Sequence, residues 1–271
     1  MIRALYTAAS GMEAQQLNLD TITNNMANAN TVGYKKSRAE FEDLMYQTIV
    51  DPGTMSSDET QIPTGIQIGL GVKLSDVTKI FTQGDLIQGK DGSNGQFPDL
   101  AIVGPGFFKI QLPGGAVAYT RAGNFQLDGQ GFVVTPNGYK LYPPIQITDP
   151  QTIRSISVSE NGKVYIERKV GNNYSLEEVG QIFLYKFINP AGLKSIGNNL
   201  FVESPASGPA IEGTPSNDGF GKIIQGKLER ANVNIVEEMV NLIVAQRAYE
   251  MNSKGIRAAD DMLREAATLK R

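Results

Sequence analysis

The stretch NIVEEMVNLIVAQRAYEMNSKGIRAADDMLREAATLK, residues 234–270, contains no proline and a single glycine. Its apolar positions alternate in steps of four and three, which predicts one long helix with a heptad-like seam. Asn234 and Glu237 have the spacing of a capping box, which marks the start of the helix. At ~1.5 Å per residue this helix is roughly 54 Å long, too long to fold back into a globular core. The predicted seam runs through Ile235, Met239, Leu242, Gln246, Tyr249, Ser253, Ile256, Asp260, Leu263 and Ala267.

The N-terminal residues repeat this pattern. Apolar or small side chains recur mostly at steps of three and four, and Gln16 is the one polar residue on the stripe. The pattern predicts a helix from about Ile2 to about Ala29. Its stripe consists of Ile2, Leu5, Ala9, Met12, Leu19, Ile22 and Met26.

Proline and glycine, which stop helices, are concentrated between these two segments. All 13 prolines lie between Pro52 and Pro215, and only three of the 29 glycines lie outside residues 53–226. We therefore expect an α+β multidomain chain in which residues 1–30 and 233–271 form a terminal coiled-coil domain. Two ordinary packing helices at the ends of one domain are the alternative.

The middle of the chain, residues 96–200, is typical of β structure. Short β-prone runs alternate with turn signals about 8–12 residues apart, which favours an antiparallel barrel or sandwich. The hairpin signals are Pro113-Gly114-Gly115, Asp128-Gly129, Asn137-Gly138 and Asn161-Gly162.

Residues 47–96 follow neither a helical nor a strand period. We interpret residues 31–95, together with residues 201–232, as an extended connecting arm with β segments that runs along the subunit or its neighbours. A flexible linker is the alternative, although solvated linkers rarely carry so many branched apolar side chains. The apolar side chains of the arm are Ile62, Ile66, Ile68 and Leu70.

The composition excludes much of enzyme chemistry. The chain has no histidine, cysteine or tryptophan, so it can have no His-containing triad, no cysteine nucleophile and no zinc site of those ligands. Gly104-Pro105-Gly106 lacks the other residues of a phosphate-binding loop and is interpreted as a bend between strands. Acidic pairs such as Glu177-Glu178 and Asp260-Asp261 are interpreted as solvated. We expect no enzyme, no cofactor and no metal site.

Charge and hydropathy exclude further classes of partner. The formal net charge is −3 without a basic block, so we expect no nucleic-acid surface. No apolar run approaches the roughly 20 residues of a membrane span. Ser10 and Glu13 interrupt the apolar core that a cleavable signal peptide would need.

An asparagine-rich motif, NNMANANTVGYKK at residues 24–36, spans the end of the first predicted helix. Asparagine is unfavourable inside helices because its amide competes for the backbone. Gly33 can adopt the left-handed turn that redirects the chain, and Tyr34 and Lys35 can anchor the outgoing arm. The predicted helix-end motif consists of Asn24, Asn25, Asn28, Asn30, Thr31, Gly33, Tyr34 and Lys35.

Four stretches carry a resemblance to a known family: NNMANANTVGYKKSRAEFEDL, DLAIVGPGFFKI, YTRAGNFQLDGQGFVVT and ANVNIVEEMVNLIVAQRAYEMNSK. The chain resembles the bacterial flagellar rod and hook family, and most closely the distal rod proteins. The segment FEDLMYQTIVDPGTMSSDETQIPTGIQIGLGV indicates the distal rod, because hook proteins lack this long arm.

The resemblance implies a non-catalytic subunit that assembles helically with itself into the rigid drive shaft of the bacterial flagellum basal body. It implies that the shaft joins the proximal rod to the hook or hook-junction proteins and passes through rings of the outer envelope. It also implies export through the flagellar type III apparatus without a cleaved signal peptide. The alternatives are a hook or proximal rod subunit, and a β-domain adhesin or binding module on a coiled-coil stalk.

In such a tube, neighbouring subunits would bury the helix ends, and the asparagine amides would supply partners for the last carbonyls. Val236, Val240 and Ile243 lie off the Met239/Leu242 seam and offer a second apolar face to other copies. In an isolated subunit that face is exposed to solvent, so we expect frayed terminal helices in the monomer. The residues predicted to pack the helices are Leu5, Met12, Leu19, Ile22, Met26, Val236, Met239, Val240, Leu242, Ile243, Tyr249, Ile256 and Leu263.

Overall fold

The structure is a computed structural model that describes residues 2–53, 55–57, 60–61, 64–93, 95–148, 153–170, 173–217 and 219–269. The chain divides into two compact units. Unit 1 comprises Met1–Ala27, Ser37–Lys79 and Asn234–Arg271, and unit 2 comprises Asn28–Lys36 and Ile80–Val233.

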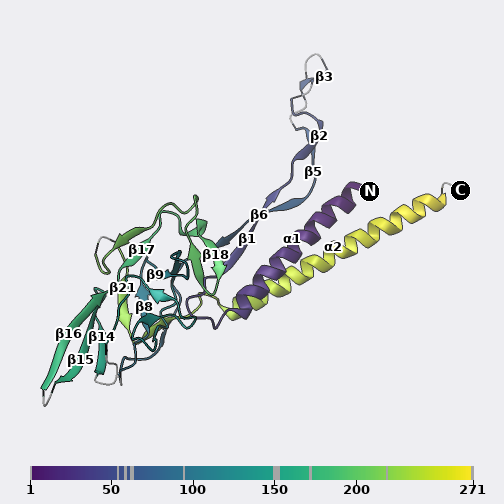
Figure 1. Cartoon of the computed structure of the whole chain (residues 1–271). Helices are drawn as coiled ribbons and strands as arrows, with labels where there is room; N and C mark the ends of the chain where they lie inside the picture. Colours follow the sequence, from purple (N-terminus) through teal and green to yellow (C-terminus); the bar gives the residue numbers. More distant parts are fainter. Residues whose placement is uncertain are drawn as a thin grey trace. The chain divides into compact units, whose positions relative to one another are not determined.

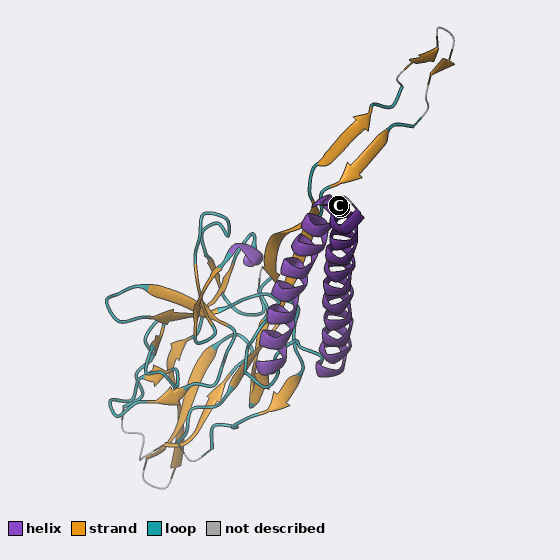
Figure 2. Cartoon of the chain, turned by 90° about the vertical axis from the view of Figure 1, so that its right-hand side faces the viewer, coloured by secondary structure: helices purple, strands orange, loops and turns teal. Residues whose placement is uncertain are grey.

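Unit 1 contains two long antiparallel helices, α1 (Ile2–Ala27) and α2 (Ile235–Leu269), which lie side by side (Figures 1 and 2). Both helices are confirmed close to their predicted bounds. At the start of α2, the backbone N–H of Val236 donates a hydrogen bond of 3.2 Å to Oδ1 of Asn234. This bond satisfies one of the N–H groups that the first helical turn leaves unpaired. Among the described helices, none has the length and apolar character that a membrane span requires.

The face of α2 that packs against α1 differs from the predicted seam at every second position, where the residue that faces α1 lies one place earlier in the sequence. Leu242 is half-buried as expected, but Met239 is 51% exposed. Asn252 lies against Gly11 of α1, where an added Cβ would come within 2.8 Å of the Asn252 Nδ2. Small side chains on the seam explain the shift, because they allow helix axes to approach closely. The α2 residues that are buried at these positions are Glu238, Ala245 and Ala259.

Two antiparallel ribbons follow α1 in unit 1 and form the part of the arm that belongs to this unit. The first pairs β1 (Ser37–Asp43) with β6 (Val72–Lys79) along α1. Near its end, the backbone N–H of Val72 donates a 3.4 Å hydrogen bond to Oγ of Ser10. Figure 1 shows the second ribbon extending away from the helix pair. It pairs β2 (Tyr46–Val50) with β5 (Ile66–Gly69), followed by β3 (Met55–Ser57) with β4 (Thr60–Gln61).

The larger sheet of unit 2 has seven strands in the order β11-β12-β13-β9-β10-β19-β18. They are β11 (Gln126–Leu127), β12 (Val133–Val134), β13 (Lys140–Leu141), β9 (Phe108–Gln111), β10 (Val117–Thr120), β19 (Leu200–Val202) and β18 (Lys194–Gly197). A second sheet contains β14 (Ile153–Val158), β15 (Lys163–Val170) and β16 (Asn173–Gln181).

Three strand pairs complete unit 2. They are β8 (Leu100–Val103) with β21 (Lys222–Gln225), β7 (Leu86–Gln88) with β22 (Lys227–Glu229), and β17 (Leu184–Lys186) with β20 (Ile211–Gly213). A short 3-10 turn covers Pro190–Gly192. All strand pairs of the described residues are antiparallel, and none of these sheets closes into a barrel.

The core of unit 2 lies between these sheets and strand pairs. Its main cluster includes the fully buried Phe108, Ile110 and Leu141. A smaller aromatic cluster gathers Phe107, Tyr119, Tyr185, Phe187, Leu193 and Phe201. The four predicted hairpin turns are confirmed, because each of them joins two paired strands.

The division into units differs from the predicted domain boundaries. Residues 80–95 and 201–232, expected in the connecting arm, belong to unit 2 together with residues 28–36. The reason is strand pairing: β7 pairs with β22 and β8 pairs with β21, so both flanking segments complete the β-rich unit.

Candidate functional site

The junction segment, residues 28–36, carries most of the asparagine-rich motif and lies within unit 2. It forms two successive turns: the N–H of Thr31 donates to the carbonyl of Asn28 at 3.0 Å, and the N–H of Tyr34 donates to the carbonyl of Thr31 at 3.3 Å. Gly33 has a φ of +70°, the left-handed conformation that its sequence position predicts.

Hydrogen bonds attach the junction segment to strands and loops that lie far along the sequence. The N–H of Gly33 donates to the carbonyl of Glu229 at 2.8 Å, and the N–H of Lys36 donates to Oδ1 of Asn232 at 2.8 Å. Nδ2 of Asn199 donates to the carbonyl of Val32, also at 2.8 Å. The segment is therefore fixed to the β-rich unit by its backbone as well as by its side chains.

Substituting Gly33 by alanine is expected to destabilise unit 2. An added Cβ would lie 2.6 Å from the backbone nitrogen of Ala122, in a conformation that alanine rarely adopts. Such strain typically costs about 1–3 kcal/mol. Gly138→Ala is the matched control, since Gly138 has a φ of +81° but nothing within 4 Å of its Cβ position. Urea unfolding should show a larger loss for Gly33→Ala, and equal losses would mean that the close approach is unimportant.

Lys35 is buried in an ion cluster with Glu229 and Arg121. Its Nζ lies 2.6 Å from Oε1 of Glu229, and Nε of Arg121 lies 3.0 Å from Oε2 of the same carboxylate. The side chains of Lys35 and Glu229 are fully buried, and that of Arg121 is 5% exposed. Burial of charge is tolerated because each cation is paired and hydrogen-bonded.

Backbone groups complete the hydrogen bonding of this ion cluster. Nη1 of Arg121 donates to the carbonyls of Gly104 and Gly106 at 2.8 and 2.7 Å. Nζ of Lys35 donates to the carbonyl of Thr82 at 2.6 Å, and the N–H of Gly84 donates to Oε1 of Glu229 at 3.0 Å. The cluster thus joins the junction segment to β22 and to the loops beside β7, β8 and β9.

The charges in the cluster shift the pKa of its members. Burial by itself raises the pKa of the Glu229 carboxyl, but the cations of Arg121 and Lys35 outweigh this effect and hold that pKa below its ordinary value of 4.5. Burial also lowers the pKa of Lys35, which Glu229 opposes. A carboxylate that two cations hold ionised is suited to a structural role, in which it connects the segments that carry the cations. Its burial and lowered pKa do not suit it to exchange protons with a substrate.

The other motif residues have partners within the same chain. The amide of Asn25 is buried in unit 1, where Nδ2 donates to the carbonyl of Ser37 at 2.7 Å and Oδ1 accepts from the N–H of Ser37 at 2.9 Å. In unit 2, Oδ1 of Asn30 accepts from Arg230 at 3.0 Å. Asn25 and Asn30 therefore bond to Ser37 and Arg230 of the same chain, whereas the sequence predicted that the amides serve the last carbonyls of the first helix. Tyr34 is buried, Asn24 is exposed on α1, and Asn28 and Thr31 bond to each other through their side chains.

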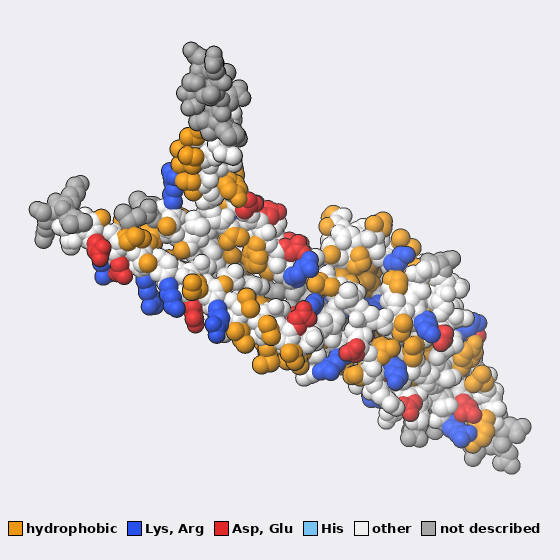
Figure 3. Space-filling view, turned by 180° about the vertical axis from the view of Figure 1, so that it is seen from behind, with side chains coloured by type: hydrophobic (Ala, Val, Ile, Leu, Met, Phe, Trp, Pro, Cys, Tyr) orange, Lys and Arg blue, Asp and Glu red, His pale blue; other side chains and the backbone are white. Residues whose placement is uncertain are grey.

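One face of α2 is apolar and exposed in the single chain. Val236, Val240, Ile243 and Val244 are 70%, 54%, 49% and 61% exposed. Figure 3 shows hydrophobic side chains at the surface of the helices. We call Val236, Val240, Ile243 and Val244 the α2 apolar face.

On α1, the predicted packing residues are turned inward: Ile22 is buried, and Leu5, Met12, Leu19 and Met26 are half-buried. The rest of the predicted set on α2 is divided, with Leu242, Ile256 and Leu263 half-buried and Met239 and Tyr249 exposed.

The arm is also apolar and exposed. Ile66, Ile68 and Leu70, on and next to β5, are all exposed, as is Tyr46 on the partner strand β2. Ile62 lies outside the described residues. Among those that are described, no group of three or more acidic side chains could hold a metal ion.

Comparison with known proteins identifies the family of the chain. Three family models match: the flagella basal body rod protein over residues 5–35, the flagellar hook protein FlgE/F/G D1 domain over 101–166, and the flagellar basal body rod FlgEFG protein C-terminal over 224–269. The flagellar basal-body rod protein FlgG of Borreliella burgdorferi is 50% identical, with 100% of both chains covered. The chain belongs to the FlgG family of flagellar basal-body rod proteins.

Other members of the FlgG family are similarly close. The protein of Caulobacter vibrioides is 48% identical over 99% of this chain and 100% of its own, and that of Bacillus subtilis is 40% identical over 100% of both. The flagellar hook protein FlgE2 of Helicobacter pylori, known from a crystal structure, is a distant match: it is 16% identical, with a TM-score of 0.23 over 72% of this chain and 43% of its own. As a FlgG-family protein, the chain is a structural rod protein of the flagellar basal body and not an enzyme.

Proposed function

We propose that this chain polymerises helically with itself into the distal rod, a rigid shaft that links the proximal rod to the hook. The observation that carries this proposal is the α2 apolar face, which the single chain leaves exposed to water. Burying each such side chain is worth about 1.5–3 kcal/mol, which favours association with other copies. Val240 follows Val236 by four positions, and Ile243 and Val244 follow Val240 by three and four, so the side chains present one continuous surface to a neighbouring helix.

The helix pair is suited to act as a coiled coil at the centre of such a shaft. Residues 238, 245, 252 and 259 of α2 recur every seven positions, as do residues 242, 249, 256 and 263, which is the spacing of coiled-coil packing. In this proposal residues 1–27 and 234–271 form the terminal coiled-coil domain, residues 37–79 the arm, and residues 28–36 with 80–233 the β-rich domain.

The arm supplies a second surface for neighbouring copies. Its exposed Ile66, Ile68 and Leu70 would be covered if the ribbon lies along adjacent subunits. Such contacts between copies would stiffen the shaft, which distinguishes a distal rod from a hook. Besides copies of itself, the proposed partners are proximal rod and hook or hook-junction proteins, rings of the outer envelope, and the flagellar export apparatus, which would deliver the chain without a cleaved signal peptide.

Electron microscopy of the purified chain over a range of concentrations tests this proposal. We expect straight helical polymers above a critical concentration, whereas curved polymers would indicate a hook-like subunit. A closed small oligomer at all concentrations would contradict the shaft.

In dilute monomer, amide hydrogen exchange should show weak protection of residues 240–260, because most helical stability comes from packing of the apolar face. Strong protection there would count against exposed helices that await partners.

A further inference from the structure

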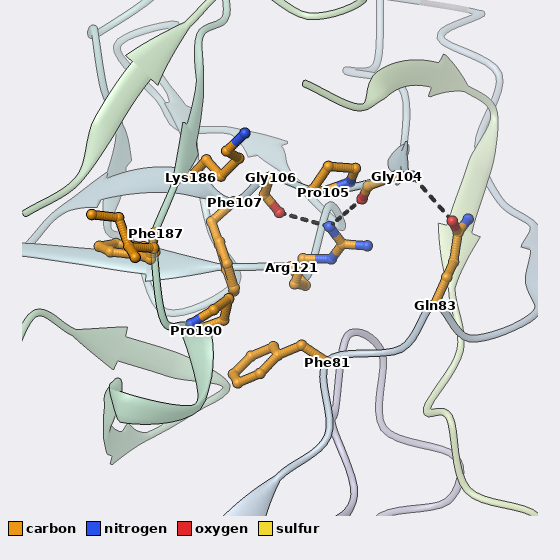
Figure 4. Close-up of a pocket in the computed structure, with 11 residues that line it drawn as sticks. Phe81, Gln83, Gly104, Pro105, Gly106, Phe107, Arg121, Lys186, Phe187 and Pro190 are labelled. Carbon is orange, nitrogen blue, oxygen red and sulfur yellow. Dashed lines mark hydrogen bonds between the residues drawn. The ribbon is translucent and has the colours of Figure 1, made fainter. Parts of the chain in front are cut away.

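A pocket of about 540 Å³ lies in unit 2 beside the Gly104-Pro105-Gly106 bend (Figure 4). Its walls include the rings of Phe81, Phe107 and Phe187. Ile188, also on its lining, is 78% exposed, so the apolar character continues onto the surface. The size is within the range of roughly 300–1,000 Å³ that is common for binding pockets.

The pocket has one cation without a counter-charge. Arg121 lines the pocket, but Glu229 neutralises its guanidinium. Oε1 of Gln83 accepts a 3.0 Å hydrogen bond from the N–H of Gly104, as Figure 4 shows. Lys186 is half-buried and has no acidic partner among the described residues. The pocket therefore suits an apolar group that carries a carboxylate nearby.

The β16 ridge, which consists of Tyr174, Leu176 and Glu178, has the complementary chemistry. The three residues alternate along β16, so they share one face of the strand. Tyr174 and Leu176 are 52% and 66% exposed. Glu178 pairs with Lys163 at 3.1 Å, but both side chains are over 40% exposed, and such surface pairs are worth little.

β16 is also at the edge of its sheet. The strand order is β14-β15-β16, so one side of β16 has no neighbouring strand among the described residues. An exposed edge with apolar side chains is a site where another chain can associate. Unit 2 thus presents an apolar ridge that carries the Glu178 carboxylate on one sheet and an apolar pocket that carries the Lys186 ammonium elsewhere.

We propose that the β16 ridge of one copy docks into the pocket of a second copy, with Leu176 against the apolar wall that the phenylalanine rings and Ile188 form and Glu178 against Lys186. The proposal rests on the proposed self-assembly, and it assigns a contact between the β-rich units. Since ridge and pocket are different surfaces, the contact is heterologous: each docked copy still presents a free pocket or ridge, and growth continues.

Cysteine cross-linking tests this contact, because the chain has no cysteine of its own. Leu176→Cys and Ile188→Cys proteins are prepared separately, mixed, assembled and oxidised. We expect a disulfide-linked dimer that contains one copy of each variant, since docking would bring the two sites within the roughly 7 Å between Cα atoms that a disulfide allows. Each variant alone should give little dimer.

Two matched pairs make the result specific. Ser175→Cys is exposed on the opposite face of β16 and, mixed with Ile188→Cys, should give about tenfold less dimer. Ile68→Cys, mixed with Ile188→Cys, tests whether the arm of another copy occupies the pocket instead of the β16 ridge. If polymers form but Ile188→Cys cross-links to Ile68→Cys, or to neither Ile68→Cys nor Leu176→Cys, the ridge contact is wrong. The proposed self-assembly into a shaft would not be affected by that result. Absence of polymer at any concentration would overturn both.

A charge exchange provides a second readout. Lys186→Glu should raise the critical concentration for assembly about tenfold, because it places two carboxylates together, and Glu178→Lys with Lys186→Glu should restore it. If the double variant assembles no better than Lys186→Glu alone, the proposed pairing of Glu178 and Lys186 is wrong.

Discussion

Replacing Glu229 with glutamine is expected to lower the free energy of unfolding of unit 2 by about 3–5 kcal/mol. The substitution keeps the shape of the side chain but leaves the buried cations of Lys35 and Arg121 without a counter-charge. Urea unfolding followed by tyrosine fluorescence measures the change. The chain has no tryptophan, and Tyr119 and Tyr185 are buried in the aromatic cluster of unit 2, so their emission reports on this unit.

Glu160→Gln is the matched control for this substitution. Glu160 pairs with Lys222 at 3.3 Å in the same unit, but the two side chains are 65% and 44% exposed. An exposed pair typically contributes no more than about 1 kcal/mol. If Glu229→Gln cost no more than Glu160→Gln, the ion cluster would not be what holds the junction segment to the β-rich unit.

The stabilising contribution of Glu229 also depends on pH. The pKa of Glu229 is below 4.5 in the folded chain, so between that lowered pKa and 4.5 the unfolded chain binds more protons than the folded one. Unfolding free energy therefore rises with pH across this window: the contribution of Glu229 is complete above it and is lost as the pH falls through the folded pKa. Glu229→Gln should therefore flatten this part of the stability profile.

The helices of unit 1 could be predicted because their signals are local. Proline and glycine are nearly absent from both ends of the chain, and apolar or small residues recur at helical spacing with few polar interruptions. The contact face of α2 was less predictable, since periodicity marks which positions are apolar and not which of two apolar faces is covered. Ala245 and Ala259 rank low as apolar residues, yet their small size allows α1 to approach, and Met239 remains outside.

The ion cluster could not be predicted beyond one member. The motif indicates Lys35 as an anchor, but its partner Glu229 lies 194 residues away, and Arg121 is 108 residues from Glu229. No local pattern connects charges at such separations, and each alone resembles an ordinary surface residue. The turn at Gly33 was predictable for the opposite reason, because a glycine after an asparagine-rich helix end is a local signal.

Substituting Val240 with aspartate is expected to abolish or strongly weaken self-assembly without unfolding the subunit. Val240 lies in the α2 apolar face and is 54% exposed in the single chain, so a charge there costs the monomer little. In a polymer the same carboxylate would replace an apolar contact worth about 1.5–3 kcal/mol and would itself be desolvated. The critical concentration should therefore rise at least about tenfold, as measured by sedimentation of polymer from monomer.

Ala258→Asp separates the effect of the apolar face from that of any added charge on α2. Residue 258 lies 18 positions beyond residue 240, about five helical turns, and so on the same side of the helix. It is exposed, and its neighbours on that side include Lys254, Asp261 and Met262, a mixed surface and not an apolar one. The control should assemble near the normal concentration while circular dichroism of both monomers stays unchanged. Equal loss of assembly in both variants would mean that the whole length of α2 is sensitive to charge. Normal assembly of Val240→Asp would remove the α2 apolar face from the interface between copies.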